Sequence, residues 1–296
     1  MMKKTLLIAL VAVLSLAVSC GDSPRTYVRK AVRIMDRNGL FAEGEAWDAA
    51  RKKALSVSPA SLDEAQKIVC EAGKVAGGKH TFLKLSDEVS EDASSTDWVM
   101  PSVKVLEDGI VIIQLPPFSG NRDQGVNYAL TVLEAIPEAL PGVVIDLRDN
   151  RGGNMYPMIA AVHRFISDDN LLRFRTRKNT QWVQLPFVMQ EAGISRSPHI
   201  ECPVALLTNE WTASSGEAVL LCFRSLDYAR VFGAPTAGYA SANQPFLLPD
   251  GSQLVLTTGC DVARTGEVFC DDPIDPDVRT ETPLEDAVAW IRNTGR

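Results

Sequence analysis

The pattern of apolar and polar positions changes at about residue 103. Before that point, apolar residues recur at helical spacing over 45–57 and 62–75. We therefore predict that residues 24–85 are mainly helical. Residues 86–102 are polar and acidic, and they carry no periodic apolar pattern, which is typical of a connecting segment or surface loop.

After residue 103, short apolar runs typical of buried strands alternate with stretches of helical periodicity. The expected strands are 103–106, 110–115, 143–147, 171–176, 180–185, 204–208, 246–248 and 254–258, and the expected helices are 126–140, 155–165, 214–224 and 284–291. Asp108-Gly109 indicates a hairpin turn between the first two strands. The alternation predicts a largely parallel sheet covered by helices, so residues 103–296 are expected to form an α/β core.

The first residues have the pattern of an export signal. Two lysines precede an almost wholly apolar run over 5–18, which is too short to span a membrane comfortably. The sequence LAVSC at 16–20 resembles a bacterial lipobox, in which the cysteine is lipidated and becomes the new N-terminus. We expect a signal peptide over 1–19, lipidation of Cys20, and a tether with a helical subdomain over 20–85. A plain secretory signal with a chance cysteine is the alternative.

Composition places the rest of the chain among globular proteins. Apolar residues make up 46% and charged residues 23%, which is too apolar for a disordered chain. The formal net charge of −7, without long clusters of lysine and arginine, argues against a nucleic-acid partner. With the expected lipid, the protein is predicted to be anchored at the bacterial cell envelope, facing the periplasm or the exterior. The sequence gives no indication of an oligomeric state.

Cysteine and histidine spacing gives little sign of a metal site. Five cysteines follow Cys20, an odd number, so at least one is free or paired between chains. Cys260 and Cys270 flank a predicted hairpin and are placed to pair across it, whereas Cys222 lies on an apolar helix face typical of a buried thiol. There is no Cys-x-x-Cys, and the three histidines are far apart in sequence, so we expect no metal.

One candidate site residue stands where a strand gives way to a helix in the segment 204–221. The helix is expected to begin at Ser214, where unpaired backbone N–H groups and the positive end of the helix dipole stabilise negative charge. Ser214 and Glu217 also form the Ser-x-x-Glu pattern of a helix N-cap. From this segment alone, a capping role is favoured.

Two further segments carry glycines beside polar groups. The strand over 143–147 leads to Gly152-Gly153, which lets the backbone approach a ligand and direct its N–H groups at it. A turn that requires positive φ is the alternative; a phosphate loop is a weaker one because neither phosphate-loop motif is present. His80 lies in the Gly-rich stretch 77–83, where a surface or capping role would be the ordinary interpretation of an isolated histidine.

Taken together, these segments resemble the serine peptidases that include the carboxyl-terminal (tail-specific) processing proteases and the tricorn core. The matching stretches are Asp146–Gly153, Thr212–Glu217, Gly233–Gly238, Asp250–Ser252 and Ile274–Asp277. Their order and rough spacing agree over about residues 45–280. The resemblance implies an α/β spiral core of the Clp-protease/crotonase type, peptide or unfolded protein substrates, and no cofactor. The PDZ domain usual in the family has no room between His80 and the strand at Val103.

The resemblance also implies roles for individual residues. Ser214 takes the position of the nucleophile, and the backbone N–H of Ser215 with that of Gly152 or Gly153 takes the position of the oxyanion hole. A serine hydroxyl is a weak nucleophile until a base accepts its proton, so the identity of the base decides whether the protein is an enzyme.

The base differs between branches of the family. In the tail-specific branch it is a lysine just after Pro-Thr-x-Gly, where this chain has Tyr239. In the tricorn-like branch it is a histidine in a Gly-His-Thr segment, which matches His80. That branch has a serine where this chain has Lys79, and a glutamate where it has Cys270. Asp272 is a candidate to orient His80 in place of that glutamate.

Three hypotheses follow. The leading one is a serine endopeptidase that acts through an acyl-enzyme on Ser214 with His80 as general base. The second is a non-catalytic peptide-binding envelope lipoprotein on the same fold, motivated by Tyr239 and Cys270 at positions where the family has catalytic groups. The third is a crotonase-like acyl-CoA enzyme, for which an acidic chain offers little to the phosphates of CoA.

Overall fold

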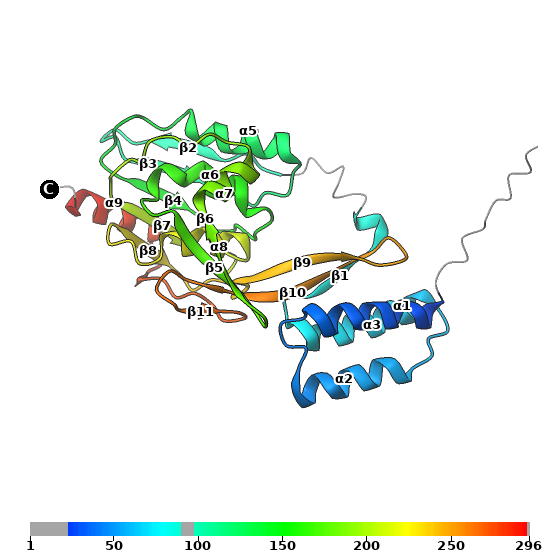
Figure 1. Cartoon of the computed structure of the whole chain (residues 1–296). Coiled ribbons are helices and arrows are strands. Elements are labelled where there is room, and N and C mark those ends of the chain that lie inside the picture. The colour runs from blue at the N-terminus through cyan, green and yellow to red at the C-terminus, as the bar shows by residue number, and fades with distance from the viewer. Residues whose placement is uncertain (1–22, 90–97, 295–296) are drawn as a thin grey trace, which may run out of the picture.

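The computed structural model describes residues 23–89 and 98–294 (Figure 1). The expected signal peptide over 1–19 and the expected lipidation site Cys20 lie outside these ranges. Within them, no helix is long and apolar enough to cross a membrane.

The N-terminal part is helical, as predicted. It consists of α1 (Pro24–Asn38), α2 (Gly44–Ser56) and α3 (Leu62–Gly77). Ser23 and Ser61 cap α1 and α3, because each side chain accepts a backbone N–H of the first helical turn. Figure 1 shows the three helices at one end of the molecule, below long strands of the core. Their apolar faces form one buried cluster with Leu254 and Leu256 of the strand β10 (Gln253–Val262), so the helices are packed on the rest of the chain.

The predicted parallel sheet is present, in the order β12-β8-β7-β4-β3-β2. Its strands are β2 (Ser102–Val105), β3 (Val111–Gln114), β4 (Val143–Asp146), β7 (Val204–Thr208), β8 (Ala229–Gly233) and β12 (Val278–Arg279). All neighbours are parallel except the predicted hairpin pair, β2 and β3. The carboxyl ends of β4 and β7 therefore lie side by side at one edge of the sheet.

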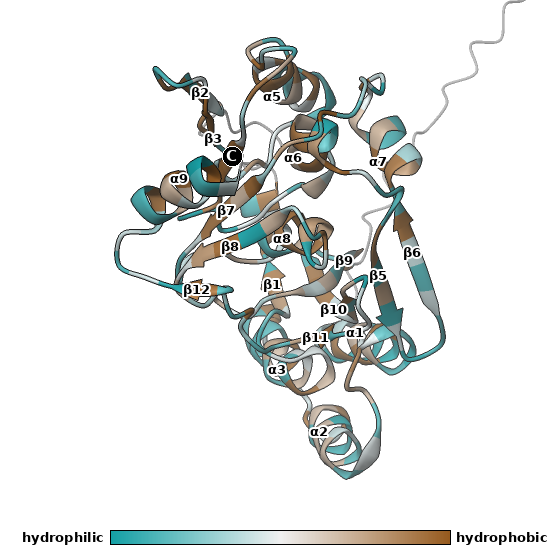
Figure 2. Cartoon of the chain, turned by 90° about the vertical axis from the view of Figure 1, so that its left-hand side faces the viewer, coloured by the Kyte–Doolittle hydropathy of each residue, from teal (hydrophilic) through white to brown (hydrophobic). Residues whose placement is uncertain are grey.

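Helices cover both faces of this sheet. They are α5 (Arg122–Leu133), α6 (Met155–Val162), α8 (Ser215–Phe223) and α9 (Pro283–Thr294), with a 3-10 turn at His163–Phe165. Along β4, Val143 and Ile145 pack with α5, α6 and α8, whereas Val144 between them packs with α9. Figure 2 shows the hydrophobic strand β7 between these helix layers. Because side chains on both faces of a strand are buried against helices, the strands appear in the sequence as continuous apolar runs.

A second, antiparallel sheet is centred on β10 (Gln253–Val262). The remaining elements are β1 (Phe82–Lys84), β5 (Asn170–Thr176), β6 (Thr180–Gln184), α7 (Leu185–Ala192), β9 (Ser241–Leu247) and β11 (Val268–Phe269). β1, β5, β9 and β11 all pair with β10, and β6 pairs with β5. A disulfide joins Cys260 to Cys270, as their positions beside the hairpin suggested, and Cys222 is fully buried. Pairing of β1 with β10 brings the segment of His80, far away in sequence, to the core.

Some boundaries differ from those predicted. The helix expected over 126–140 is α5, which begins at Arg122 and ends at Leu133. Asn121 and Gln124 form a reciprocal capping box that fixes the earlier start. The helix ends before Pro137, which disfavours helical geometry at the residue ahead of it.

Candidate active site

The loops that follow β4 and β7 are joined through Asn150, which is fully buried. Its Oδ1 accepts the N–H of Gly152 at 3.0 Å, and its backbone oxygen accepts the N–H of Ala213 at 2.9 Å. Its Nδ2 donates to the backbone oxygen of Leu115 at 2.7 Å. Through its side chain and its backbone oxygen together, Asn150 thus fixes the Gly-rich loop against the loop that leads to Ser214.

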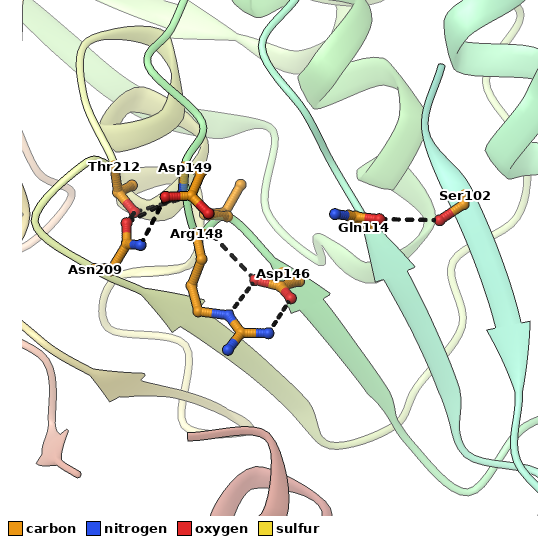
Figure 3. A network of polar contacts seen from close by, with 8 residues as sticks. Ser102, Gln114, Asp146, Arg148, Asp149, Asn209 and Thr212 are labelled. Atoms are coloured by element: carbon orange, nitrogen blue, oxygen red, sulfur yellow. Dashed lines mark hydrogen bonds and ion pairs between the residues drawn. The ribbon is translucent and has the colours of Figure 1, made fainter. Parts of the chain in front are cut away.

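A second group of polar contacts holds the same two loops together (Figure 3). Arg148 donates through Nε and Nη2 to the two oxygens of Asp146, at 2.9 and 2.6 Å. Asn209 accepts the N–H of Asp149 and donates to its carboxylate, both at 3.0 Å. The N–H of Asn209 in turn donates to Thr212 Oγ1 at 3.1 Å. The polar residues of the two predicted motifs therefore have a structural role, because their hydrogen bonds hold the loops after β4 and β7 in place.

Ser214 stands at the start of α8 in a strained conformation, with φ 52° and ψ −116°. Such a backbone costs a non-glycine residue about 1–3 kcal/mol and requires its surroundings to hold it. The carboxylate of Glu217, fully buried, accepts the N–H of Ser214 at 2.8 Å. It also accepts Thr236 Oγ1–H at 2.5 Å and the N–H groups of Gly238 and Tyr239 at 3.0 and 2.8 Å. Burial nevertheless raises the pKa of Glu217, although these hydrogen bonds oppose the shift.

Gly152 and Gly153 lie beside the candidate nucleophile with φ of 102° and 113°. A Cβ at Gly152 would come within 2.8 Å of Ser214 Cβ. The N–H of Gly152 is already used by Asn150. In the part of the chain that the structure describes, no hydrogen bond uses the N–H of Gly153 or of Ser215, and Ser215 Oγ donates to the Gly153 oxygen at 2.6 Å. Of the two glycines considered for the oxyanion hole, Gly153 is the one with an available donor.

Ser214 faces a cavity of about 640 Å³ between the two sheets. The loops after β4 and β7 form one side of it, and β9 and β10 form the other. Ser214, Ser215 and Gly153 line it together with Ser241 of β9 and Asp261 of β10. The cavity is therefore lined both by the candidate nucleophile and by the available N–H donors.

His80 reaches this region from the loop before β1. Its Nδ1 is 2.9 Å from Ser241 Oγ, and its ring meets the Tyr239 ring edge to face at 5.1 Å. Burial, and then the charge of Lys79, lower the pKa of His80 to about 4, so the imidazole is neutral at neutral pH. Among the described residues no hydrogen bond joins His80 to Ser214; Ser241, which lines the cavity with Ser214, is what the ring contacts.

The structure does not bring Asp272 to His80. Asp272 is exposed, and the side chain bonded to His80 Nδ1 is Ser241 instead. The glutamate position of the tricorn-like branch is Cys270, which is covalently bonded to Cys260. The expectation that Asp272 orients the histidine is therefore corrected: a serine hydroxyl of β9 is hydrogen-bonded to the ring instead.

The position of the absent lysine base is filled by Tyr239, whose N–H is held by Glu217. The ammonium of Lys79 lies 4.7 Å from the centre of the Tyr239 ring, and it donates to the backbone oxygen of Ala237 at 3.3 Å. A cation over an aromatic ring is favourable by electrostatics. Lys79 and Tyr239 are two positions at which this chain differs from the family pattern, and their side chains are therefore in contact with each other.

Sequence reasoning missed Asp261 and Ser241. Asp261 is 2% exposed, and its Oδ1 has no hydrogen-bond partner. Burial, and then the charge of Glu217, raise its pKa well above the usual range. The available signal was a carboxylate inside a long apolar strand, which is costly unless the acid has a use or stays protonated. No group of histidines, cysteines and acids in residues 23–89 and 98–294 is arranged to hold a metal ion.

A strained serine between a buried strand and a helix, beside backbone N–H groups that are free to donate to an oxyanion, is the arrangement of a serine hydrolase. The sequence pattern of peptidase family S41 matches residues 109–280. The chain belongs to this family, whose members are serine peptidases acting on peptides or proteins, and the resemblance noted in the sequence is confirmed.

Relatives support the same assignment. The chain is 33% identical over 281 residues to the nisin-resistance protein of Lactococcus lactis subsp. lactis, covering 92% of this chain and 88% of the relative. It is 27% identical over 247 residues to a probable CtpA-like serine protease of Staphylococcus aureus, covering 81% of this chain and 47% of that protein.

Two solved structures are similar. A lipoprotein from Streptococcus agalactiae is 30% identical, with a TM-score of 0.84 over 92% of this chain and 97% of that one. The photosystem II D1 C-terminal processing protease is 14% identical, with a TM-score of 0.63 over 93% of this chain and 98% of that one, and it shows the fold alone. The predicted α/β fold with an N-terminal helical part is therefore confirmed.

Proposed function

We propose that this protein is a serine endopeptidase of the bacterial cell envelope that cleaves peptide bonds through an acyl-enzyme on Ser214. The observation that carries the proposal is the position of Ser214. It is held in a strained conformation beside the available N–H groups of Gly153 and Ser215, and all three line one cavity.

His80 is proposed as the general base. Its lowered pKa keeps it neutral, and a proton on Nδ1 donated to Ser241 Oγ would leave the lone pair of Nε2 for the proton of Ser214. Ser214 Oγ then attacks the peptide carbonyl, and the oxyanion accepts the N–H groups of Gly153 and Ser215. His80 returns the proton to the leaving amine, and water hydrolyses the acyl-enzyme by the same path.

An envelope location and a lipid anchor on Cys20 belong to the same proposal. The LAVSC sequence at 16–20 supports them, and so does the similarity to a solved lipoprotein. The name of the Lactococcus relative connects that protein with resistance to nisin, and we propose nisin as one test substrate beside unfolded casein.

A peptide-binding protein without catalysis is the second candidate. Two observations favour it: His80 makes no hydrogen bond to Ser214 within the described ranges, and Tyr239 replaces the lysine base of the tail-specific branch. Such a protein would use the cavity beside Ser214 to hold a peptide without attacking it.

Labelling with a fluorophosphonate, combined with cleavage assays, separates the two candidates. The chain without its signal peptide is expected to be labelled on Ser214 and to cleave casein or nisin, while Ser214→Ala does neither. His80→Ala is expected to react about 10²–10⁴-fold more slowly. Absence of labelling in the wild type, with peptide binding equal in all three proteins, would establish the binding protein and reject the peptidase.

A further inference from the structure

The outer face of α1 is strongly cationic, although the whole chain carries a net charge of −7. The helix has five basic residues and one acid, and the basic ones are all exposed. They are Arg25, Arg29, Lys30, Arg33 and Arg37. The four arginines follow each other at intervals of four, which places them along one side of a helix.

Packing holds this row of charges toward the outside. The opposite side of α1 is buried against α3 and β10, with Tyr27 and Met35 almost completely covered. The one acid of the helix, Asp36, is bound by Arg51 Nε at 3.0 Å and by Trp47 Nε1 at 2.9 Å. It therefore already has a cationic partner from α2.

The four arginines have no ion-pair partner among the residues that the structure describes. Some exposed arginines elsewhere do form ion pairs, for example Arg196 with Asp169 at 2.8 Å and Arg292 with Asp108 at 2.7 Å. A row of unpaired like charges on one helix repels itself, so it is stabilised by a surface of opposite charge.

An exposed apolar group lies next to the row. Leu247, at the end of β9, is 72% exposed, the largest fraction of any bulky apolar side chain in the described part of the chain. Together with Pro249 in the following turn, it borders a shallow hollow of about 450 Å³ whose other side includes Arg33 and Arg37. Cations beside an exposed apolar side chain are typical of surfaces that lie at a membrane interface.

We propose that the arginine face of α1, defined as Arg25, Arg29, Arg33 and Arg37, docks with Leu247 on an anionic lipid bilayer. The charge of the arginines matches that of anionic headgroups, and Leu247 enters the interface between headgroups and acyl chains. The position of α1 in the sequence agrees. Pro24 follows Cys20 by four residues, so a lipid on Cys20 would keep the helix within about 14 Å of the membrane.

Docking in this orientation also places the cavity relative to the membrane. β9 runs from Ser241, which lines the cavity, to Leu247 beside the arginine face. A strand of that length spans about 20 Å. With Leu247 in the interface, the cavity can lie no farther than about that distance from the lipid, within reach of peptides bound to the membrane surface.

Co-sedimentation with lipid vesicles tests the proposal on the chain without signal peptide and without lipid. We expect binding to vesicles that contain about one-third phosphatidylglycerol, weakening with added salt, and no binding to pure phosphatidylcholine. Arg29→Gln, Arg33→Gln and Arg37→Gln together are expected to weaken binding about a hundredfold, at about fivefold for each arginine. Leu247→Ala is expected to weaken it further.

The matched control replaces three exposed arginines elsewhere, Arg196→Gln, Arg279→Gln and Arg292→Gln, with the same change in net charge. It is expected to bind as the wild type does, and thermal unfolding checks that both triple variants fold. Equal binding by the two triple variants, or no binding of the wild type to anionic vesicles, would overturn the proposal. Neither result bears on the peptidase, because fluorophosphonate labelling of Ser214 needs no membrane.

Discussion

The carboxylate of Glu217 holds the backbone of Ser214, accepting its N–H at 2.8 Å, in the same turn of helix that the serine begins. The same side chain accepts hydrogen bonds from Thr236, Gly238 and Tyr239. The Ser-x-x-Glu pattern is thus a helix-start pattern that also fixes the loop before β9. A capping role and a catalytic position are compatible here, because the glutamate binds the backbone of the serine.

Replacing this glutamate tests that relationship. Glu217→Gln keeps the shape but turns one acceptor oxygen into an amide that faces N–H donors, so we expect a loss of about 2–3 kcal/mol in the free energy of unfolding. Urea unfolding measures it, and fluorophosphonate labelling of Ser214 should slow in parallel. Glu267→Gln, whose exposed carboxylate pairs with the partly buried Arg224, is the control and should cost about 1 kcal/mol or less. Equal losses in both variants would contradict the role given to Glu217.

Ser241 is expected to position His80. Ser241→Ala removes the side-chain partner of His80 Nδ1, so the ring loses a preferred tautomer and orientation, and labelling of Ser214 should slow about tenfold. The second-order rate constant for labelling measures the effect. Ser102→Ala removes another serine hydroxyl that makes a hydrogen bond, far from the cavity, and should leave the rate unchanged. An unchanged rate in Ser241→Ala would remove Ser241 from the account of the site.

The elements that the sequence predicted correctly are those with a clear local period or a long apolar run. β4 and β7 are buried on both faces, and α3 begins at a capping residue. Each of these elements can therefore be predicted from its own residues. β8 was missed because Arg230 interrupts its apolar run. β9 begins earlier than predicted, and its polar residues are strand only because they pair with β10.

The residues of the candidate site also fall into those that the sequence predicted and those that it did not. Ser214, Gly153 and His80 stand in motifs that can be found in the sequence, whereas Ser241 and Asp261 stand on β9 and β10 without any local pattern. Their places follow from the pairing of β10 with both β1 and β9, which joins segments more than a hundred residues apart. Asp272 was predicted to orient His80 from its position in the sequence. In the structure it lies two residues after the disulfide-bonded Cys270 and is exposed.

Because Gly153 is in close contact with its neighbours, adding a methyl group there by Gly153→Ala is expected to lower the stability of the protein strongly. A Cβ at this position would lie 2.0 Å from the backbone oxygen of Phe118, in addition to the strain of φ 113°. We expect Gly153→Ala to lower the free energy of unfolding by more than about 4 kcal/mol. Gly44 also has a positive φ, of 78°, but a Cβ there meets no heavy atom within 4 Å, so Gly44→Ala should cost about 1–2 kcal/mol. Similar losses in urea unfolding would show that the contact with Phe118 is not what requires glycine.

The buried carboxyl of Asp261 predicts how stability changes with pH. Its pKa is raised in the folded protein, so between the usual aspartate range and that raised pKa the folded state keeps a proton that the unfolded chain has lost. This stabilising contribution is present at low pH and is lost as pH rises. The amide introduced by Asp261→Asn does not titrate, so this variant should gain stability relative to the wild type as pH rises above the usual aspartate range toward the raised pKa of Asp261.

Urea unfolding of both proteins across this range measures the difference. Asp275→Asn, which removes an exposed carboxylate paired with Arg279, controls for the loss of one negative charge and should leave the slope of stability against pH nearly unchanged. Parallel curves for Asp261→Asn and the wild type would show that the carboxyl is ionised alike in the folded and unfolded chains. A carboxyl that ionises freely in the cavity that Ser214 faces would also place a negative charge in the same cavity as the developing oxyanion, which opposes the proposed chemistry.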